Sequence, residues 1–537
     1  MKRAFLLALL IASPAPAQVS YERLLNSRDE PGSWLMYSGD YSGQRFSNLR
    51  SINVANVHQL RPAWIYQTEG RVSSINTSPL VADGLMYIAE PPGTVSALDA
   101  RTGNVVWRYR HPLPEGHVVQ WVNRGVAIAG RIIFYFTHDA YLLAIDADSG
   151  HLRWKKKVAE HTRGHVLAAA PLVVKDKIIV GSTVGTRAVR GFMDAYDIKT
   201  GERIWRFWTI PASGEPNNET WSGDSWKTGG AGAWITGSFD PQLNLLFWGT
   251  GNPVPAYDGE SRKGDNLYAN SLLALDLDTG KLKWHFQFTP HDLWDWDACH
   301  VPVLVDRVFQ GRHRKLILTA NKNGHYYVLD RENGQFLVGE PFVRQNWSDG
   351  IDPSGRPRVR PSAIPRNEWT LIRPILLGGT NWTSPTYSRQ TELFYVTVRD
   401  DSARIKRIPA PLRSGEVFNW GGATQILRSP DDFHGIKALH PDTGRLKWQF
   451  EVTRPTYSGL LSTAGGLVFG GSMDGNFFAL DAGSGKPLWH FQTGGQISGN
   501  PVTFAIDGKQ YVATPAGSAV ITFALPTGTG ARATIKP

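Results

Sequence analysis

One short segment brings acids and large aromatic rings together within a few positions. It covers residues 289–300 and reads TPHDLWDWDACH, with acids at Asp292, Asp295 and Asp297 and tryptophans at Trp294 and Trp296. Carboxylates near apolar rings repel one another and resist desolvation, so they persist when exposed, bound to a cation or used for proton transfer. Side chains two apart share one face of an extended segment, which predicts that Asp295 and Asp297 face one way and the tryptophans the other.

The composition indicates which elements must position these side chains. The chain has 537 residues and contains 55 Gly, 34 Pro and 20 Trp. Long stretches with apolar residues at helical spacing are few, whereas short apolar runs bounded by turn residues are common. The sequence therefore predicts an all-β protein of many short strands.

A hairpin-sized pattern recurs along the chain: Ala, then Asp two positions later, Gly six later and Trp ten later. Intact copies are ALDARTGNVVW from Ala97, AIDADSGHLRW from Ala144, AYDIKTGERIW from Ala195, ALDLDTGKLKW from Ala274 and ALDAGSGKPLW from Ala479. Imperfect copies begin at Val328, where Val338 replaces the Trp, and at Ala438, where His440 replaces the Asp. Most copies lie about 40 to 55 residues apart, the size of a four-stranded propeller blade, and the larger gaps before Gly280 and Gly444 indicate insertions.

Each copy is readily explained as a β-hairpin. The Asp side chain can accept turn N–H groups, Gly can take a positive φ, and the Trp can fill the joint with a neighbouring blade. An eighth, broken copy keeps Ala524 and Gly530 near the C-terminus, while Trp64 near the N-terminus has no hairpin of its own. We therefore predict a single eight-bladed β-propeller of four-stranded antiparallel blades, closed by pairing of the N- and C-terminal strands; two smaller propellers are the alternative.

The first residues have the pattern of an export signal. Residues 1–17 combine Lys2 and Arg3 with a short apolar run and an Ala-Pro-Ala end, which predicts a signal peptide cleaved after Ala17 and a periplasmic or secreted propeller over residues 18–537. No later stretch is long enough for an integral membrane segment. The net charge of +10 comes from dispersed Lys and Arg, a pattern that does not indicate nucleic-acid binding.

The repeats and their surroundings resemble the pyrroloquinoline quinone (PQQ)-dependent alcohol dehydrogenases, the quinoprotein family that includes the methanol dehydrogenase large subunit. The resemblance runs from WLMYSGDYSGQRFSNLRSINVANVHQL to DGKQYVATPAG. It implies that the chain oxidises an alcohol, polyol or sugar by hydride transfer to metal-bound PQQ. The family segment TPHD-x-WD carries the catalytic Asp, which Asp295 matches, as a base that takes the alcohol proton. His291 and Asp292 are expected to structure the loop.

The same resemblance implies a metal site formed by Asn252, Asp295 and Asp297. Asn252 lies in the family motif GTGNP, and an Asp at position 297 resembles the lanthanide-using branch. Thr186 stands where the family has a Glu, and a hydroxyl is a weaker ligand for a hard cation than a carboxylate. The metal is therefore expected to be Ca²⁺ or a lanthanide ion, with Asp297 compensating for the missing Glu or the metal affinity being low.

Five further residues match the family's cofactor contacts: Trp234 as the stacking floor, and Arg124, Thr137, Lys322 and Asn381 around the rim. Basic residues at the rim suit a cofactor with three carboxylates. The chain departs from the family at Val118 and Val119, where adjacent cysteines usually form a disulfide, and at Asn76, where a Glu is usual.

Electrons must leave for a separate acceptor, because covalent c-type haem needs C-x-x-C-H and Cys299 is the chain's one cysteine. The expected partners are a small alcohol and a soluble c-type cytochrome. An alternative is that the chain has the propeller fold but acts as a non-catalytic binding or assembly scaffold, because fold alone does not establish activity. Trp234, Asn252, Asp295 and Lys322 together favour the enzyme.

Overall fold

A computed structural model describes residues 18–70, 74–115, 122–409 and 420–526. The predicted signal peptide at residues 1–17 and the predicted cofactor ceiling at Val118 and Val119 lie outside these residues. Strands dominate, as predicted, and the described α-helix is α1 (Tyr21–Leu25). The 3₁₀ turns are η1 (Ser27–Asp29), η2 (Val57–Gln59), η3 (His161–Arg163), η4 (Asn218–Thr220), η5 (Ser225–Thr228), η6 (Gly259–Arg262) and η7 (Pro361–Ala363). Within the described ranges, no helix has the length and apolar character needed to cross a membrane.

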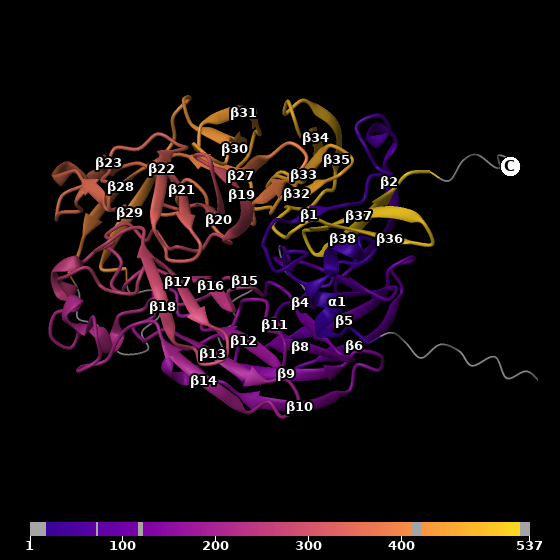
Figure 1. Ribbon diagram of the computed structural model, residues 1–537, viewed down its shortest axis with the longest axis horizontal. Coiled ribbons are helices and arrows are strands. Elements are labelled where there is room, and N and C mark those ends of the chain that lie inside the picture. The colour runs from indigo at the N-terminus through magenta and orange to yellow at the C-terminus, as the bar shows by residue number, and fades with distance from the viewer. Residues whose placement is uncertain (1–17, 71–73, 116–121, 410–419, 527–537) are drawn as a thin grey trace, which may run out of the picture.

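The first five large sheets each consist of four antiparallel strands, and each strand pairs with the one that follows it in the sequence. They are β3 (Leu80–Ala82), β4 (Leu85–Glu90), β5 (Thr94–Asp99) and β6 (Val105–Arg110); β7 (Ala127–Ala129), β8 (Ile132–Phe136), β9 (Tyr141–Asp146) and β10 (Leu152–Lys157); β11 (Leu172–Val174), β12 (Lys177–Gly181), β13 (Phe192–Asp197) and β14 (Arg203–Trp208); β15 (Ser238–Asp240), β16 (Leu245–Gly249), β17 (Ser271–Asp276) and β18 (Leu282–Gln287); and β19 (Val303–Phe309), β20 (Arg312–Ala320), β21 (His325–Asp330) and β22 (Phe336–Pro341). These sheets follow one another around the molecule (Figure 1).

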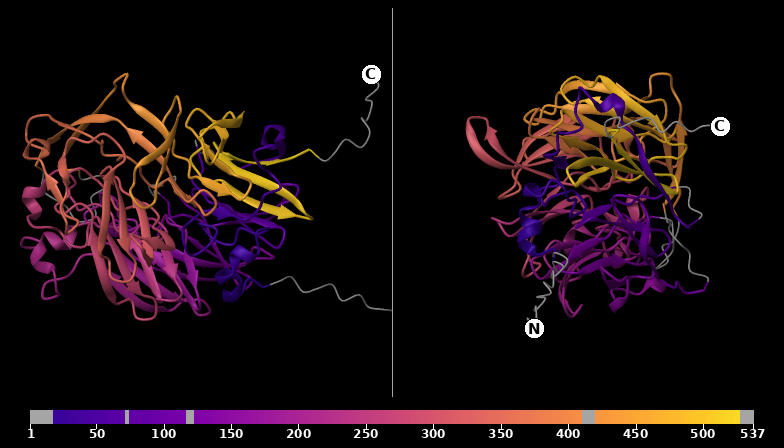
Figure 2. Two further views of the ribbon diagram at one scale, coloured as in Figure 1. Left: turned by 45° about the horizontal axis from the view of Figure 1, so that its top comes forward. Right: turned by 90° about the vertical axis from the view of Figure 1, so that its right-hand side faces the viewer.

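The later sheets repeat this plan with additions. They are β26 (Thr386–Ser388), β27 (Leu393–Asp400), β30 (Phe433–Leu439) and β31 (Leu446–Glu451); β32 (Leu461–Thr463), β33 (Leu467–Gly471), β34 (Asn476–Asp481) and β35 (Pro487–Gln492), joined by β1 (Phe46–Ser47); and β36 (Val502–Ile506), β37 (Lys509–Ala516) and β38 (Ala519–Ala524), joined by β2 (Arg61–Gln67). Strand β2 pairs with β38, so N- and C-terminal strands share a sheet, and both views in Figure 2 keep them together. Two small sheets are insertions: β23 (Ser348–Ile351) with β24 (Pro357–Val359), and β25 (Thr370–Ile372) with β28 (Ser402–Arg407) and β29 (Gly422–Leu427).

The repeat tryptophans fill the joints between neighbouring sheets. Trp107 of β6 covers Gly150 in the β9–β10 turn so closely that a Cβ there would lie 2.7 Å from the ring, and its indole N–H donates to the carbonyl of Ala147 at 2.8 Å. The same contact recurs for Trp64 on Gly103, Trp154 on Gly201, Trp205 on Gly280, Trp284 on Gly334 and Trp448 on Gly485. The predicted role of the repeat Trp and Gly is confirmed.

The topology gives each four-stranded sheet two functionally different edges. In an antiparallel hairpin, the residues before the first strand and after the second lie at one end of the strands, while the turn between the two strands lies at the other end. We call the first end of each sheet its entry edge and the second its turn edge; neither term refers to an outermost strand. Loops at the entry edge of successive sheets therefore converge without being close in sequence.

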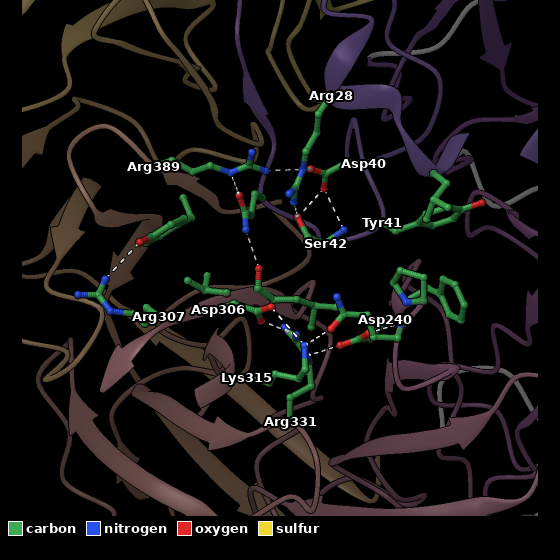
Figure 3. A pocket seen from close by; sticks show the side chains of 18 of the residues that line it. Arg28, Asp40, Tyr41, Ser42, Asp240, Asp306, Arg307, Lys315, Arg331 and Arg389 are labelled. Atoms are coloured by element: carbon green, nitrogen blue, oxygen red, sulfur yellow. Dashed lines mark hydrogen bonds and ion pairs between the residues drawn. The ribbon is translucent and has the colours of Figure 1, made fainter. Parts of the chain in front are cut away.

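The turn edge of three sheets borders a cavity of about 490 Å³ (Figure 3). Its charged side chains are paired with one another. Asp40 binds Arg28 and Arg389 at 2.5 and 3.3 Å. Arg331 binds Asp240 and Asp306 at 2.7 and 2.5 Å. None of the predicted site residues lines this cavity.

Candidate active site

The predicted site residues lie in entry-edge loops. Those that precede the first strand of a sheet are Arg124 before β7, Trp234 before β15, Asp295 and Asp297 before β19, and Asn381 before β26. Those that follow the second strand are Thr137 after β8, Asn252 after β16 and Lys322 after β20. The fold therefore brings residues that are spread over nearly half of the chain to one side of the molecule.

The acidic segment is a structured loop rather than a strand. The buried carboxylate of Asp292 accepts the backbone N–H groups of Trp294 and Trp296 at 3.1 and 3.0 Å. Asp295 has a φ of 67°, in the left-handed region that residues other than glycine seldom adopt. Burial raises the pKa of Asp292 to about 6, and the Arg262 guanidinium and these N–H groups oppose the rise. The structural role predicted for Asp292 is confirmed, but the predicted extended backbone is wrong at Asp295.

The tryptophans of the segment form a layer behind the acids. Trp294 and Trp296 are buried and stacked, with ring centroids 4.7 Å apart, and Trp347 packs on both. Their indole N–H groups donate to the carbonyls of Ala363 and Ile375 at 2.9 and 3.0 Å. This layer holds the acidic loop in place and excludes water from its back.

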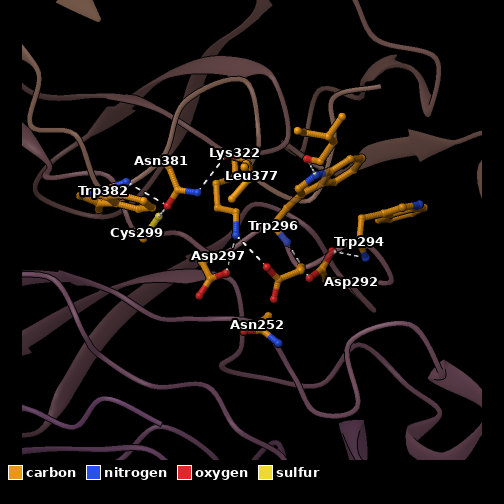
Figure 4. A network of polar contacts seen from close by, with 12 residues as sticks. Asn252, Asp292, Trp294, Trp296, Asp297, Cys299, Lys322, Leu377, Asn381 and Trp382 are labelled. Atoms are coloured by element: carbon orange, nitrogen blue, oxygen red, sulfur yellow. Dashed lines mark hydrogen bonds and ion pairs between the residues drawn. The ribbon is translucent and has the colours of Figure 1, made fainter. Parts of the chain in front are cut away.

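Asp295 and Asp297 share one cation from the chain itself, the Lys322 ammonium, which Figure 4 shows pointing toward Asp297. The Lys322 ammonium lies 3.1 Å from Asp295 Oδ2 and 2.8 Å from Asp297 Oδ1, and all three side chains are nearly inaccessible to solvent. Burial raises the pKa of Asp295 well above its usual range, Lys322 opposes that rise, and Asp297 and Asp292 add to it. Burial lowers the pKa of Lys322, but the two carboxylates outweigh it, so the net direction is upward. A carboxyl group with a raised pKa is suited to proton exchange near neutral pH.

Asp297 also joins the acidic loop to Trp234. The indole N–H of Trp234 donates to Asp297 Oδ2 at 2.8 Å. This approach requires glycine at position 251, because a Cβ there would lie 2.7 Å from the same oxygen. The next residue, Asn252, is buried, and its side-chain amide donates to the carbonyl of Pro253 at 3.0 Å. Two of the predicted metal ligands, Asp295 and Asp297, therefore meet at Lys322, and Asn252 follows the glycine that approaches Asp297.

Arg124 is a buried cation that stacks on Trp234. Its guanidinium carbon lies 4.8 Å from the centroid of the indole ring, and the residue is 6% exposed. Its Nε has no hydrogen-bond partner in the described part of the chain, and burial lowers its pKa. A buried guanidinium without an acceptor is costly unless a ligand supplies one, so this corner of the site fits an anionic group.

The fourth rim residue, Asn381, brings in side chains that the sequence analysis missed. Its Oδ1 accepts the Cys299 thiol at 3.3 Å and the Trp382 backbone N–H at 3.0 Å. The Trp382 ring stacks on Tyr457, with centroids 5.0 Å apart and planes 9° from parallel. Tyr457 precedes β32 and therefore lies in another entry-edge loop. This position was the feature of the sequence that could have identified it.

Three other residues stay outside this network. The Thr137 hydroxyl accepts the backbone N–H of Tyr141 at 2.9 Å, closing the turn before β9. Asn76 donates to the carbonyl of Ser498 at 3.2 Å. For these two and Thr186, no hydrogen bond to Asp295, Asp297 or Lys322 occurs in the described ranges. The cofactor role of Thr137 stays a prediction.

The side chains present fit a planar anionic cofactor and supply hard oxygen ligands. Trp234 offers an aromatic face, and Arg124 and Lys322 offer positive charge to carboxylates or carbonyl oxygens. Carboxylate and amide oxygens at Asp295, Asp297 and Asn252 suit a hard cation. Among the described residues, however, no group of three or more His, Cys, Asp and Glu side chains is arranged to hold a metal ion. A cation here would rely on two carboxylates and an amide.

Comparisons with known proteins agree with this geometry. Residues 34–345 and 434–512 match the family described as "Glucose/ethanol/alcohol dehydrogenase, beta-propeller domain". The chain is 38% identical to the quinoprotein alcohol dehydrogenase PedH of Pseudomonas putida, over 95% of this chain and 90% of that protein. It is 36% identical to the lanthanide-dependent methanol dehydrogenase of Methylacidiphilum fumariolicum, over 96% and 90%.

A solved structure of a europium-containing methanol dehydrogenase has the same fold. It superposes with a TM-score of 0.87 and 33% identity, covering 94% of this chain and 100% of that one. The matched relatives are enzymes, and none of these comparisons favours the scaffold alternative. With the family match spanning most of the sequence and its relatives aligned almost end to end, the chain belongs to the PQQ-dependent quinoprotein alcohol dehydrogenase family.

Proposed function

We propose that the protein is an exported dehydrogenase that oxidises an alcohol, polyol or sugar with PQQ and a hard metal ion. The observation that carries this proposal is the buried entry-edge network in which Lys322 joins Asp295 to Asp297 and Asp297 joins Trp234, with Arg124 stacked beside it. Bound PQQ would supply a carbonyl that accepts two electrons as a hydride, and a cation would polarise that carbonyl.

The chain's own residues bind and orient the cofactor. Trp234 provides the floor on which a planar ring system stacks. The Arg124 guanidinium would pair with a cofactor carboxylate, which would give its Nε an acceptor that the described residues do not provide. Lys322 and Asn381 would donate to quinone oxygens, while the Cys299 thiol and the Trp382 N–H keep the Asn381 amide in its present orientation.

Asp295 is the proposed base for the alcohol proton. Its carboxylate is buried beside Lys322 and Asp297, and burial raises its pKa. A raised pKa increases the proton affinity of the carboxylate, and the adjacent ammonium keeps the ionised form accessible. The tryptophan layer behind the loop keeps water away from the group while the C–H bond is broken.

Asp297 decides which metal the site accepts in this proposal. With Thr186 in place of the family Glu, two carboxylates and the Asn252 amide form the ligand set, and Asp297 supplies half of its anionic charge. The lanthanide-dependent and europium-containing relatives support a trivalent ion, and Ca²⁺ is the alternative.

A closed ring of eight blades is the proposed frame for this site. Within the described residues eight sheets have four or five strands, and the pairing of β2 with β38 joins the two ends of the chain. Closure fixes the relative positions of entry-edge loops that come from different sheets.

Export and the electron acceptor complete the proposal. The signal pattern at residues 1–17 supports a periplasmic or secreted enzyme. The single cysteine leaves no place for covalent c-type haem, so a soluble c-type cytochrome is the proposed acceptor.

Reconstitution of the purified apoprotein tests the proposed function. PQQ is added with Ca²⁺ or La³⁺, its binding is followed by quenching of tryptophan fluorescence, and turnover is measured with a dye acceptor over a panel of alcohols. We expect PQQ binding and alcohol-dependent dye reduction with at least one of the metals. Absence of PQQ binding with both metals would reject the proposal.

A further inference from the structure

A small inserted sheet lies directly over the tryptophan layer of the acidic loop. Strands β25, β28 and β29 form it, and Figure 1 shows β28 and β29 at the edge of the molecule. Its inner side chains Ile372, Ala403 and Ile405 are buried in one cluster with Trp294 and Trp296. The inner face of the inserted sheet is thus part of the support of the proposed active site.

The outer face of this sheet exposes large apolar side chains beside cations. Trp369 and Leu371 are 43% and 51% exposed. Arg404 is the cross-strand partner of Leu371, and the Lys406 ammonium lies 5.0 Å from the centroid of the Trp369 ring. Exposed Trp and Arg side chains in one patch are typical of protein interfaces rather than of ordinary surface.

The patch carries positive charge that no carboxylate of the described residues neutralises by an ion pair. Arg366, Arg404, Lys406 and Arg428 form no ion pair with any carboxylate in the described part of the chain. The three strands contain no Asp or Glu. Of the acids beside them, Asp400 and Asp401 are buried and paired with other residues, which leaves Glu368, Asp431 and Asp432 near the patch. A second copy of the chain docking through the same patch would bring like charges together, which disfavours self-association. An acidic partner is complementary to it.

The proposed reaction requires a protein partner that takes electrons, and this step rests on the proposed function. As the alcohol C–O bond becomes a carbonyl, the substrate loses two electrons and two protons. Each ferric c-type haem accepts one electron and becomes ferrous, so two acceptor molecules are reduced for each alcohol and the two protons pass to solvent. The acceptor must therefore dock and leave twice in each cycle, as transient redox partners with small interfaces do.

The inserted sheet offers such an acceptor a short route to the site. The Trp294 and Trp296 indoles, which flank Asp295, donate to the carbonyls of Ala363 and Ile375, and these residues lie on either side of β25. A single sheet layer, about 10 Å thick, separates the outer face from this tryptophan layer. Electron tunnelling falls steeply with distance, which favours docking here over the far side of the molecule.

We infer that the outer face of the β25–β28–β29 sheet, centred on Trp369, Leu371, Arg404 and Lys406, is the docking surface for the electron acceptor. The partner is a soluble c-type cytochrome with an acidic rim around its haem. Its contact combines a small apolar centre at Trp369 and Leu371 with a ring of charge pairs.

A matched pair of double variants tests this inference. Leu371→Ala with Arg404→Glu changes the patch, while Leu446→Ala with Lys447→Glu makes the same kind of change on β31, where Leu446 is 50% exposed. For both proteins we measure the Kd for an acidic ferricytochrome c by calorimetry at low and high salt. Turnover of the PQQ-loaded enzyme is measured with that cytochrome and with a small dye acceptor.

We expect the patch variant to bind the acidic cytochrome at least tenfold more weakly at low salt, with a matching rise in KM for it. The β31 variant should match the unsubstituted protein, and dye turnover should be equal in all three. High salt should reduce the difference between the patch variant and the unsubstituted protein. Equal cytochrome affinity of the two double variants would overturn the inference. Loss of dye turnover in the unsubstituted protein would instead count against the proposed function, and the Kd would still test the surface.

Discussion

The β19–β20 hairpin carries charged side chains at both edges, but the two groups are arranged differently. At the turn edge, Asp306 lies opposite Lys315 in the ladder and also binds Arg331, and its carboxylate is 58% exposed. At the entry edge, Asp295 and Asp297 share Lys322, and all three are buried. The turn-edge charges neutralise one another beside solvent, whereas the entry edge concentrates two carboxylates around one ammonium.

This difference indicates that the turn-edge charges stabilise the fold, whereas the entry-edge charges are suited to chemistry. Ion pairs near solvent contribute little energy and shift proton affinity little, whereas buried, unequally matched charges shift it strongly. The cavity of about 490 Å³ at the turn edge is roomy, yet its charges have partners. Site chemistry is indicated by two buried carboxylates that share one ammonium, and by Arg124, whose Nε has no partner among the described residues, rather than by cavity size.

The largest expected effect comes from removing the proposed base. Asp295→Asn should lower kcat by at least about a hundredfold, because an amide cannot take the alcohol proton, while PQQ binding is largely kept. Dye-linked turnover and fluorescence titration measure the two properties. Asp306→Asn, the same change at the turn edge, should leave turnover unchanged. Normal turnover of Asp295→Asn would move the chemistry to another group.

The choice of metal ion tests whether Asp297 at the entry edge is a metal ligand, in contrast to Asp306 at the turn edge. Asp297→Ala should abolish lanthanide-supported activity and weaken binding of Tb³⁺ by about 10- to 100-fold, measured by luminescence excited through tryptophan. Adding Thr186→Glu to that variant should restore activity with Ca²⁺, because it returns the carboxylate that the family has at this position. Asp306→Ala serves as the control. If metal preference stays the same in both variants, Asp297 is a loop residue only.

Protonation of a buried histidine at the entry edge should lower the free energy of unfolding, whereas protonation of an exposed histidine at the turn edge should not. His325 opens β21 at the entry edge, and burial lowers its pKa to about 4. The unfolded chain, with a histidine pKa near 6.5, binds the proton more readily, so stability present above pH 6.5 is lost as the pH falls toward 4. At pH 5 the loss is about 2 kcal/mol for this one group.

Urea unfolding at pH 7 and pH 5 measures this loss. His325→Gln should reduce the drop in unfolding free energy between the two pH values by that amount. His313→Gln, at the exposed turn end of β20, should not change the drop. Equal pH dependence of His325→Gln and the unsubstituted protein would show that His325 does not contribute.

The smallest expected effect is on cofactor affinity. Arg124→Ala removes a buried guanidinium whose Nε has no acceptor among the described residues, and it should raise the Kd for PQQ about tenfold, the scale of a charge-assisted hydrogen bond. Arg389→Ala at the turn edge, where Asp40 is the partner, should leave this Kd unchanged. Fluorescence titration compares them. An unaltered Kd for Arg124→Ala would remove Arg124 from the cofactor site.

Much of the fold could be predicted because its signals are local and repeated. The Asp99 carboxylate accepts the N–H groups of Arg101 and Thr102 in its turn, and Gly103 takes a φ of 77° against Trp64, as the repeat pattern predicts. Insertions were also expected from the spacing, and the small sheets occupy the gap between the copies at Val328 and Ala438. The shape of each insertion was not predictable, because no second copy displays it.

The meeting of several predicted site residues at the entry edge could be anticipated from the sequence, but their contacts could not. Entry-edge loops converge because of the sheet topology, so Asp297 and Trp234 meet although 63 positions separate them. The left-handed backbone at Asp295 depends on tertiary contacts, and Lys322 reaching both carboxylates depends on how two loops pack. Stacking of Trp382 on Tyr457 likewise joins different sheets and leaves no pattern in either segment.

A crystal structure of the protein loaded with PQQ and La³⁺ tests the central claim most directly. The account predicts an anomalous lanthanum peak beside Asp295 and Asp297, and quinone density stacked on Trp234 with a carboxylate at Arg124. Cofactor or metal density in the turn-edge cavity lined by Asp306 and Arg331, with the entry edge unchanged, would contradict it.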